Sequence, residues 1–516
     1  MSTTEIRADL PTHVPRLAAG IPLAAGVTPP RAVPEAVGIV HLGWGAFHRG
    51  HQAVYTEDAM AATGDLRWGI LGDVERTPQL VDAVRPQGGL YTVLSVGLDD
   101  AGNVVESARV VGSVVDIAYP GEETPRLVGA MAAPTTHLVT LTITEKGYTR
   151  RPDGHLDTDQ AGPDIEALAS EEAAGSDDVS AARPAATAVG LLVRGLAARR
   201  RAGGHALTVL SCDNMPDNGK VLKGVVDELI DAALPGAAGE ALRTWLAGSV
   251  TFPGSMVDRI TPATTPEVLD RVAALIGARD EGAIIAEPFT QWVIEDNFAG
   301  PRPAWELVGA ELTDDVVPWE DAKLRMLNGT HSLLAYAGRL AGHATLAEAV
   351  TDAALIEHAR AFMFDDALPT LTAPAGADLR AYGEELLRRF ANPATGHATR
   401  QVSTDGTHKI PIRWGVAATR NLEAGRVPQG VAYGLAAWSE FVRRAVRDGV
   451  ELGDPSGAER LTAVVREVGL DDVAGVATAL VALPGVLPDG TGTDERLVRA
   501  VVQHATALAA SGTGLL

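Results

Sequence analysis

The amino-acid sequence has 516 residues, 46% of them hydrophobic and 4% aromatic, which is enough apolar material for two or more folded domains. Its formal net charge of −23 repels phosphate backbones and anionic membranes, so we expect neither a nucleic-acid nor a membrane partner. The single cysteine, Cys212, excludes an intrachain disulfide and a cysteine-rich zinc site.

Residues 1–36 contain several prolines and no clear periodicity, which predicts an extension laid over the surface or partly disordered. Within them, the apolar run 17–27 superficially resembles a signal peptide. Against that, Glu5 and Asp9 precede the run and Pro22 interrupts it. No apolar run in the chain is long enough to span a membrane, so we expect a cytoplasmic protein.

Residues 37–310 alternate between strand-like and helical patterns. Short apolar runs predict strands at 38–42, 68–71, 91–96, 110–117, 137–144, 207–211 and 283–286. Helical patterns are found between several of them, at 51–62, 187–201 and 220–233. The stretch 151–184 is rich in Gly, Ala, Asp, Glu and Pro and predicts a long surface loop with one helical turn. The alternation is typical of an α/β fold, a Rossmann-like doubly wound parallel sheet with helices on both faces.

After about residue 311 the strand-like runs disappear. Helical patterns follow at 333–340, 346–362, 378–390, 431–447, 458–468 and 494–510. We therefore predict a mainly α-helical C-terminal domain over residues 311–516, with the boundary near residue 310.

A glycine turn, Gly43-Trp-Gly45, directly follows the first predicted strand and precedes a helix. Glycines at this point let the backbone turn sharply and approach a pyrophosphate, and the free N–H groups of the helix start can bind the phosphates. His48 occupies the position of the third glycine in the usual fingerprint. The pattern is also compatible with a plain tight turn.

An acidic residue follows the second predicted strand, where Asp73 is succeeded by Glu75. A carboxylate there accepts hydrogen bonds from the adenosine ribose and disfavours a 2′-phosphate, which favours NAD. The neighbouring Arg76 would instead favour NADP.

Three polar residues with catalytic potential, Lys323, Asn328 and His331, lie in one mostly apolar stretch. A dehydrogenase needs a base for the hydroxyl proton and donors for the developing alkoxide, and a buried lysine can serve as that base. On a straight helix the three residues would spread over an arc of roughly 140°. Gly329 marks a bend or a helix start that would bring them together; the spacing alone equally allows a solvated lysine, a capping asparagine and a structural histidine.

Six motifs follow one another between about residues 38 and 415. They are IVHLGWGAFHRGHQ at 39–52, LTITEKGY at 141–148, SCDNM at 211–215, FPGSMVDRITP at 252–262, EPFTQWVIED at 287–296 and KLRMLNGTH at 323–331. In these motifs the chain resembles the polyol-specific long-chain dehydrogenase/reductase family, which includes mannitol 2-dehydrogenase, arabinitol dehydrogenase and fructuronate reductase. The resemblance implies a metal-independent, NAD-dependent enzyme that works as a monomer on a small sugar acid or alditol.

The resemblance also implies roles for individual residues. Lys323 matches the catalytic base, Asn214 and Asn328 the amide pair of the oxyanion hole, His331 a substrate-orienting residue and Glu320 a proton-path carboxylate. From the motifs and the resemblance together, we expect the cofactor to be bound by Gly43, Gly45, Ala46, Phe47, His48, Arg49, Asp73, Thr144, Glu145 and Asp258. We expect the substrate to be bound by Asn214, Asp258, His331, Arg400, Lys409 and Arg413.

The substrate is less sharply indicated. The mannitol branch of the family carries an arginine eight residues before the lysine matched by Lys409, whereas this chain has Gln401, as fructuronate reductases do. A uronate carboxylate must be paired on burial, and Lys146, Arg400, Lys409 and Arg413 are candidates. We expect the D-mannonate/D-fructuronate pair, with D-mannitol/D-fructose and arabinitol as alternatives. A non-catalytic nicotinamide-binding sensor is the alternative from another class.

Overall fold

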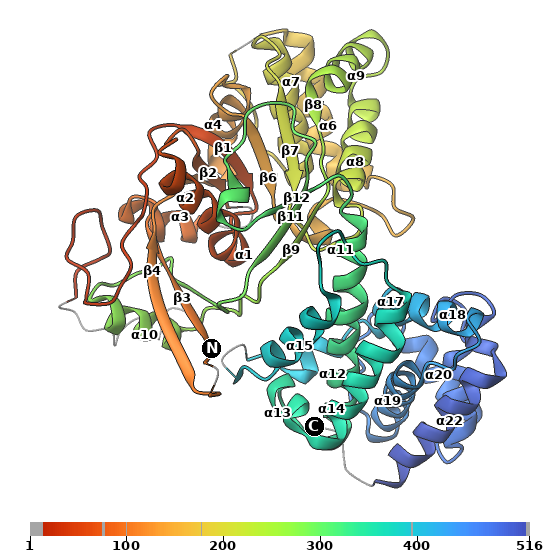
Figure 1. The fold of residues 1–516 in the computed structure, drawn as a ribbon. Coiled ribbons are helices and arrows are strands. Elements are labelled where there is room, and N and C mark those ends of the chain that lie inside the picture. Colours follow the sequence, from red (N-terminus) through yellow and green to blue (C-terminus); the bar gives the residue numbers. More distant parts are fainter. Residues whose placement is uncertain (1–13, 75–77, 100, 177, 394–395, 512–516) are drawn as a thin grey trace. The chain divides into compact units, whose positions relative to one another are not determined.

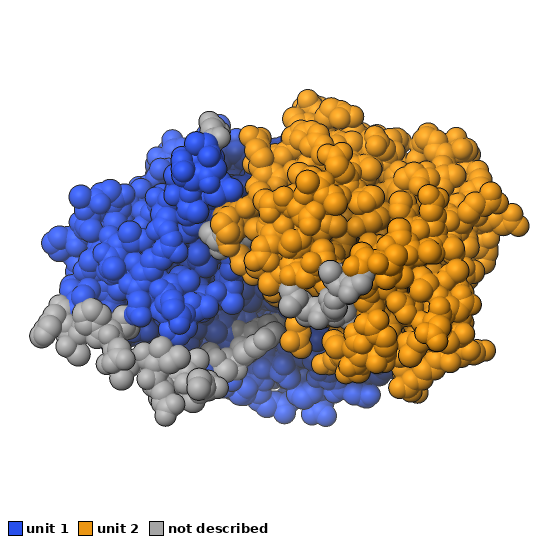
Figure 2. Space-filling model, turned by 90° about the horizontal axis from the view of Figure 1, so that it is seen from below, with its two compact units in different colours: residues 1–316 blue, residues 317–516 orange. Residues whose placement is uncertain are grey.

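The computed structural model describes residues 14–74, 78–99, 101–176, 178–393 and 396–511. It divides into two compact units, residues 1–316 and residues 317–516, which Figure 2 shows in different colours.

The centre of the first unit is a six-stranded sheet in the order β5-β2-β1-β6-β7-β8, in which every pair is parallel. Its strands are β1 (Val37–Leu42), β2 (Gly69–Asp73), β5 (Val114–Ala118), β6 (Leu138–Leu141), β7 (Leu207–Ser211) and β8 (Val250–Thr251). The strand order reverses between β1 and β6, so this is the topological switch point of a Rossmann-like sheet. The predicted fold class is confirmed.

Helices cover both faces of this sheet because successive side chains of a strand point to opposite faces. On β1, Val40 and Leu42 belong to one apolar core and Ile39 to another. The helices of the unit are α1 (Ala46–Gly50), α2 (Gln52–Thr63), α3 (Gln79–Val84), α4 (Pro120–Ala132), α5 (Thr144–Gly147), α6 (Thr158–Ala174), α7 (Ala188–Arg201), α8 (Asn218–Ala233), α9 (Ala237–Ser249) and α10 (Pro266–Ile276). Figure 1 shows α4, α6, α7 and α8 gathered around β6 and β7.

Two smaller sheets complete the first unit. One has the order β10-β3-β4, with β3 (Tyr91–Leu98), β4 (Val104–Val111) and β10 (Ile284–Ala286). The other has the order β12-β11-β9, with β9 (Ser255–Asp258), β11 (Gln291–Glu295) and β12 (Glu311–Thr313). The runs 91–96 and 283–286 form strands, as predicted, and pair in parallel with each other, but in a sheet separate from the central one, because an apolar run does not reveal its pairing partner. The run 110–117 is not one strand: it joins the end of β4 to β5 across Gly112 and Ser113.

The segment 151–184 corrects a second expectation. It is not mainly a loop, because α6 runs through it from Thr158 to Ala174. Asp157 caps the helix by accepting hydrogen bonds from the N–H groups of Asp159 and Gln160, which satisfies two otherwise unpaired donors. The glycine, proline and acidic content of the segment concealed this cap.

The described part of the N-terminal segment pairs with the first unit. Its backbone bridges Arg16 to Arg279 and Thr28 to Arg109, and the side chain of Leu17 is buried. Across the described residues, no helix is both long enough and apolar enough to cross a membrane.

The second unit is helical, as predicted. Its α-helices are α11 (Val317–Ala322), α12 (Gly329–Ala341), α13 (Leu346–Thr351), α14 (Ala353–Arg360), α15 (Leu379–Phe390), α16 (Thr399–Val402), α17 (Gly406–Ile410), α18 (Val416–Glu423), α19 (Gln429–Asp448), α20 (Ala458–Val468), α21 (Val473–Val481) and α22 (Glu495–Ala510). The α19 helix packs against α12, α21 and α22 and is buried from Gly430 to Ala445.

Three wide π-helical turns, at Lys323–Asn328, Ala361–Ala367 and Pro411–Gly415, interrupt these helices. The first of them packs against each of the other two. The pattern at 346–362 is therefore not one helix but α13, α14 and the start of the second π-helical turn. Asp352 ends α13 and caps α14 by accepting from the N–H groups of Ala354 and Leu355.

Candidate active site

The glycine turn after β1 uses its two glycines differently. Gly43 has a φ of +84°, and a Cβ there would collide with the carbonyl oxygen of Thr142. Gly45 has a φ of −97°, and the nearest atom to a Cβ there would be the Gly43 oxygen at 3.7 Å. The fold therefore requires Gly43, whereas it leaves the space beside Gly45 open for a ligand.

The departure from the glycine fingerprint at His48 has a structural explanation. The His48 ring is fully buried and stacks on the His41 ring with centroids 3.5 Å apart. His41 in turn lies between the hydroxyls of Thr140 at 2.8 Å and Thr142 at 3.0 Å. Burial lowers the pKa of both imidazoles, that of His41 to about 3, so both rings are neutral in the folded protein.

Other predicted residues of this segment point into the protein as well. The Arg49 guanidinium donates to the carbonyl oxygens of Gly45 at 3.2 Å and Gly282 at 2.5 Å. Ala46 is the first residue of α1, and the Phe47 ring stacks on His51 with centroids 5.0 Å apart. The structure thus places His48 and Arg49 as supports of the turn, and a phosphate would meet its backbone.

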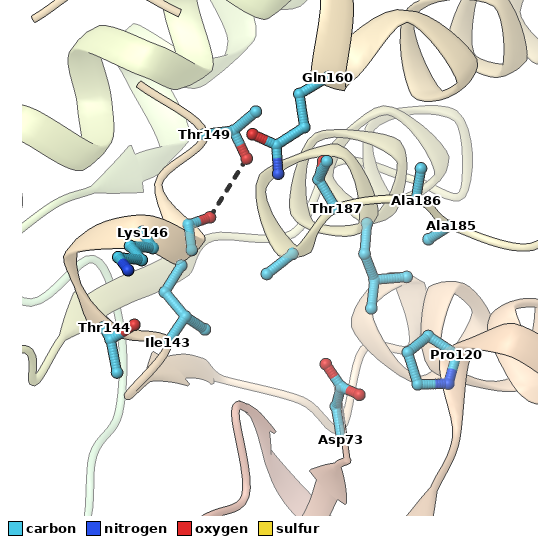
Figure 3. Close-up of a pocket in the computed structure, with 13 residues that line it drawn as sticks. Asp73, Pro120, Ile143, Thr144, Lys146, Thr149, Gln160, Ala185, Ala186 and Thr187 are labelled. Carbon is cyan, nitrogen blue, oxygen red and sulfur yellow. Dashed lines mark hydrogen bonds between the residues drawn. The ribbon is translucent and has the colours of Figure 1, made fainter. Parts of the chain in front are cut away.

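A pocket opens at the carboxyl ends of β2, β5 and β6, beside the switch point, where open α/β sheets bind their ligands (Figure 3). Figure 3 shows Asp73 reaching into it from the end of β2, near Pro120 and opposite Ile143. Ala185, Ala186 and Thr187, just before α7, line another side of the pocket. This pocket is the candidate cofactor site, and Asp73 stands where a ribose-binding carboxylate is expected; Glu75 and Arg76 lie outside the described residues.

The turn after β6 contributes Thr144 and Lys146 to the same pocket. Lys146, a candidate for pairing a substrate carboxylate, therefore lines the candidate cofactor pocket. Glu145 beside it is exposed.

Asn214 and Asp258 follow or end strands of the first unit. Asn214 lies just beyond β7 and is exposed, whereas Asp258 is the last residue of β9 and is buried.

The first π-helical turn of the second unit explains how Lys323, Asn328 and His331, the candidate catalytic segment, come to lie on one side of the helix. Residues five apart lie one above the other in such a turn, so Lys323 and Asn328 share a face. The α12 helix begins at Gly329, and residues three apart on an α-helix are neighbours, which places His331 next to Asn328. The change of helix type removes the spread expected for a straight helix. Lys323, Asn328 and His331 are all buried, as is Glu320 on α11.

Gly329 is the helix start that was the alternative to a bend, and it has a further role in packing. A Cβ at this position would lie 2.5 Å from the ring of Phe362, which belongs to the second π-helical turn. The glycine thus allows the two wide turns to pack closely.

His331 lies in a cationic environment. Its ring stacks on Phe390 with centroids 4.6 Å apart, and its Nε2 has no hydrogen-bond partner among the described residues. Burial lowers the pKa of His331 well below its usual value, and His397, Arg413, Arg389 and Lys409 lower it further. A neutral imidazole with an uncommitted buried nitrogen is suited to a substrate hydroxyl.

The predicted cations of the second unit divide into two groups. Arg413 donates to the Asn328 carbonyl at 3.2 Å and to the Ser332 hydroxyl at 2.8 Å, and it adjoins the catalytic segment. Lys409 donates to the Val402 carbonyl at 3.4 Å and to the Thr404 hydroxyl at 3.2 Å. Its positive charge helps to lower the pKa of His331. Arg400 is exposed on α16.

Two residues of this environment were missed by sequence reasoning. Arg389 is the buried penultimate residue of α15, and the His397 ring lies 5.4 Å from that of His331. A charge at the end of a helix gives no sequence signal that separates it from a solvated arginine. Among the described residues, no group of three or more His, Cys, Asp or Glu side chains is placed to hold a metal ion.

Comparison with known proteins adds a family context. The chain matches the mannitol dehydrogenase Rossmann domain over residues 37–307 and the mannitol dehydrogenase C-terminal domain over residues 315–506. It is 39% identical over 471 residues to the D-mannonate oxidoreductase of Escherichia coli K12, covering 90% of this chain and 91% of that protein.

Two solved structures share the fold over nearly the whole chain. A D-sorbitol dehydrogenase in substrate-free form has a TM-score of 0.83 and 28% identity, covering 96% of this chain and 99% of the other. Pseudomonas fluorescens mannitol 2-dehydrogenase, in a ternary complex with NAD and D-mannitol, has a TM-score of 0.75 and 31% identity, covering 95% and 96%.

Proposed function

The chain belongs to the mannitol dehydrogenase family, and we propose that it is an NAD-dependent oxidoreductase that interconverts D-mannonate and D-fructuronate. The single observation that carries the proposal is the alignment of Lys323, Asn328 and His331 by the π-helical turn, among the cationic side chains around His331. That arrangement provides a base, an amide donor and an anion-binding environment in one unit.

The residues of the candidate cofactor pocket fit NAD. The open space beside Gly45 accommodates a pyrophosphate, and Asp73 supplies the ribose carboxylate that disfavours a 2′-phosphate. Bound there, NAD would supply the acceptor for the hydride of the carbinol carbon. A comparison of kcat/KM with NAD and NADP tests this part of the proposal, and a preference for NADP would contradict it.

The remaining chemistry belongs to side chains. Lys323 takes the hydroxyl proton, which requires that its amine be neutral at that moment, and Glu320 passes the proton towards solvent. The amides of Asn328 and Asn214 donate to the alkoxide oxygen as negative charge develops there. His331 Nε2 binds a substrate hydroxyl and fixes its orientation. The lysine and the amides thereby do the work that a zinc ion does in other alcohol dehydrogenases, so we propose a metal-independent reaction.

Lys323→Ala tests the catalytic assignment. We expect kcat to fall at least about 100-fold, because the base is lost, while the Kd for NAD changes little. A variant that binds NAD normally and turns over at the wild-type rate would show that Lys323 is not the base. A wild-type protein that binds NAD but turns over none of the candidate substrates would instead favour the nicotinamide-binding sensor.

The substrate proposal rests on charge. Arg389, Lys409 and Arg413 act together on His331, and a sugar acid brings a carboxylate that such a cluster can pair, whereas an alditol brings none. The similarity to D-mannonate oxidoreductase points the same way. D-mannitol and arabinitol remain the alternative substrates, since a mannitol 2-dehydrogenase is also similar.

We further propose that the enzyme acts in the cytoplasm as a monomer. Sedimentation of the purified protein tests the second statement, and a single dimeric species would contradict it.

A further inference from the structure

Asn214 is exposed at the end of β7, yet the backbone on either side of it is held by buried groups. We propose that Asp213 and Asn218 are positioning residues that fix the amide of Asn214 for catalysis. The inference rests on the proposed role of Asn214 as a donor to the alkoxide.

The Asp213 carboxylate joins the ends of two neighbouring parallel strands. It accepts a hydrogen bond from the N–H of Thr144 at 2.7 Å and one from the N–H of Ile143 at 3.2 Å, both just beyond β6. The hydroxyl of Tyr148 donates to it at 2.9 Å. Thr144 has a φ of +65°, a conformation that L side chains rarely adopt, so the carboxylate holds a strained turn in place.

Asn218 holds the same segment from the opposite side. Its Nδ2 donates to the carbonyls of Asp213 at 3.0 Å and Ser255 at 2.7 Å, and its Oδ1 accepts from the Ser255 N–H at 3.1 Å. The Ser255 hydroxyl donates to the Ser211 carbonyl at 2.6 Å. Asn218 and Ser255 are buried, and Asn218 begins the 16-residue helix α8, so the loop ends on a rigid element.

This network fixes the backbone before and after Asn214, which is itself an exposed residue. A donor held in this way needs no rearrangement when charge develops on the substrate, which is the condition for effective electrostatic stabilisation. Keeping the Asp213 carboxylate buried and charged also costs folding free energy, which a purely structural contact would not need to spend. Burial raises the pKa of Asp213 to about 6, despite the hydrogen bonds from Thr144, Tyr148 and Ile143 that favour its charged form.

A double-mutant cycle tests whether Asp213 acts through Asn214. Asp213→Asn keeps the size of the side chain but replaces a carboxylate oxygen by a donor that opposes the backbone N–H groups. With NAD at saturating concentration, because the Thr144 turn also lines the candidate cofactor pocket, we expect kcat for D-mannonate or D-mannitol, whichever is turned over faster, to fall by roughly 100-fold. In the Asn214→Ala background the same substitution is expected to lower kcat less than about twofold.

The matched control is Glu57→Gln on α2. Glu57 is also a buried carboxylate with a raised pKa, and it accepts the Gly112 N–H at 2.6 Å. We expect this substitution to lower the melting temperature and to leave kcat unchanged.

Equal effects of Asp213→Asn in the two backgrounds would overturn the inference, because Asp213 would then act independently of Asn214. If Asp213→Asn does not fold, Tyr148→Phe removes one donor to the carboxylate and is carried through the same cycle, with the same two outcomes. If Asn214→Ala alone leaves kcat unchanged, the proposed role of Asn214 fails and the inference fails with it. That result is distinct from a failure of the positioning role, in which Asn214→Ala stays damaging.

Discussion

At the residue scale, the chain separates groups that support the site from groups that face a ligand. The motif of the glycine turn contains residues that support the turn and residues that face a ligand, but the sequence does not tell these two roles apart. His48 and Arg49 were predicted as cofactor-binding residues; in the structure His48 stacks on His41, and Arg49 donates to backbone carbonyls. Only packing around the turn distinguishes the two roles, and packing depends on strands distant in the sequence.

Gly45→Ala and Gly43→Ala form a matched pair that tests this distinction. A Cβ at position 45 meets no protein atom closer than 3.7 Å, so we expect normal stability and a Kd for NAD raised about tenfold or more. A Cβ at position 43 would collide with the Thr142 carbonyl. The backbone there also has a positive φ, which alanine rarely adopts, so we expect a loss of about 1–3 kcal/mol in unfolding free energy. Normal NAD affinity in Gly45→Ala, measured by titration, would show that the phosphates do not pass beside this residue.

The buried histidines predict an acid-sensitive fold. His41, His48 and His331 are neutral when folded because burial lowers their pKa values, whereas in the unfolded chain they titrate near the ordinary value of about 6.5. The unfolded state therefore binds more protons below that pH, and stability is full above about pH 6.5 and falls as the pH is lowered.

Each such histidine contributes up to about 1.4 kcal/mol per pH unit to this loss. We expect His331→Gln to flatten the dependence of unfolding free energy on pH between 6.5 and 5. His155 is fully exposed, and its pKa is raised by Glu228, so His155→Gln is the control that should not flatten it. A pH dependence that is the same in His331→Gln and in the wild type would contradict the assignment.

At the scale of elements, the π-helical turn at Lys323–Asn328 is the feature that sequence spacing could not supply. The motif named the polar residues, but an ideal helix spreads them around its axis, and the sequence has no signal for a turn with five-residue spacing. The first strand, its turn, β7 and α20 were predictable because each is a local apolar pattern. The α6 helix and the allocation of β3 and β10 to a separate sheet were not, since a cap inside a polar segment and a pairing partner are not visible in such a pattern.

Gly329→Ala tests whether the packing of the wide turns aligns the catalytic segment. The added methyl group would meet the Phe362 ring, so we expect a loss of about 1–3 kcal/mol in stability and a lower kcat. Adding Phe362→Leu shortens the obstructing side chain, and the double variant should regain most of both properties. Failure of this rescue, measured by thermal unfolding and turnover, would mean that Gly329 acts through something other than Phe362.

At the scale of the whole molecule, a strongly acidic chain carries a local cluster of cations. The net charge of −23 disfavours anionic ligands over most of the surface, while Arg389, Lys409 and Arg413 surround His331 in the second unit. Composition gives only an average charge for the surface, whereas the fold brings these residues together from α15, α17 and the third π-helical turn.

Removal of metal ions tests the proposed chemistry at the same scale. A lysine base and amide donors need no Lewis acid, so we expect dialysis against EDTA to leave kcat/KM unchanged. Loss of activity that Zn²⁺ or Mg²⁺ restores would contradict this mechanism.

The most direct test of the account compares kcat/KM for D-mannonate and D-mannitol, with NAD as the oxidant, in the wild type and in Lys409→Met. The account predicts a clear preference for D-mannonate in the wild type. In Lys409→Met the loss should fall mainly on D-mannonate, because a paired carboxylate is worth more than a hydrogen-bonded hydroxyl. A wild-type enzyme that prefers D-mannitol, or a Lys409→Met variant that loses both activities equally, would contradict the assignment of the cationic cluster to a sugar-acid carboxylate.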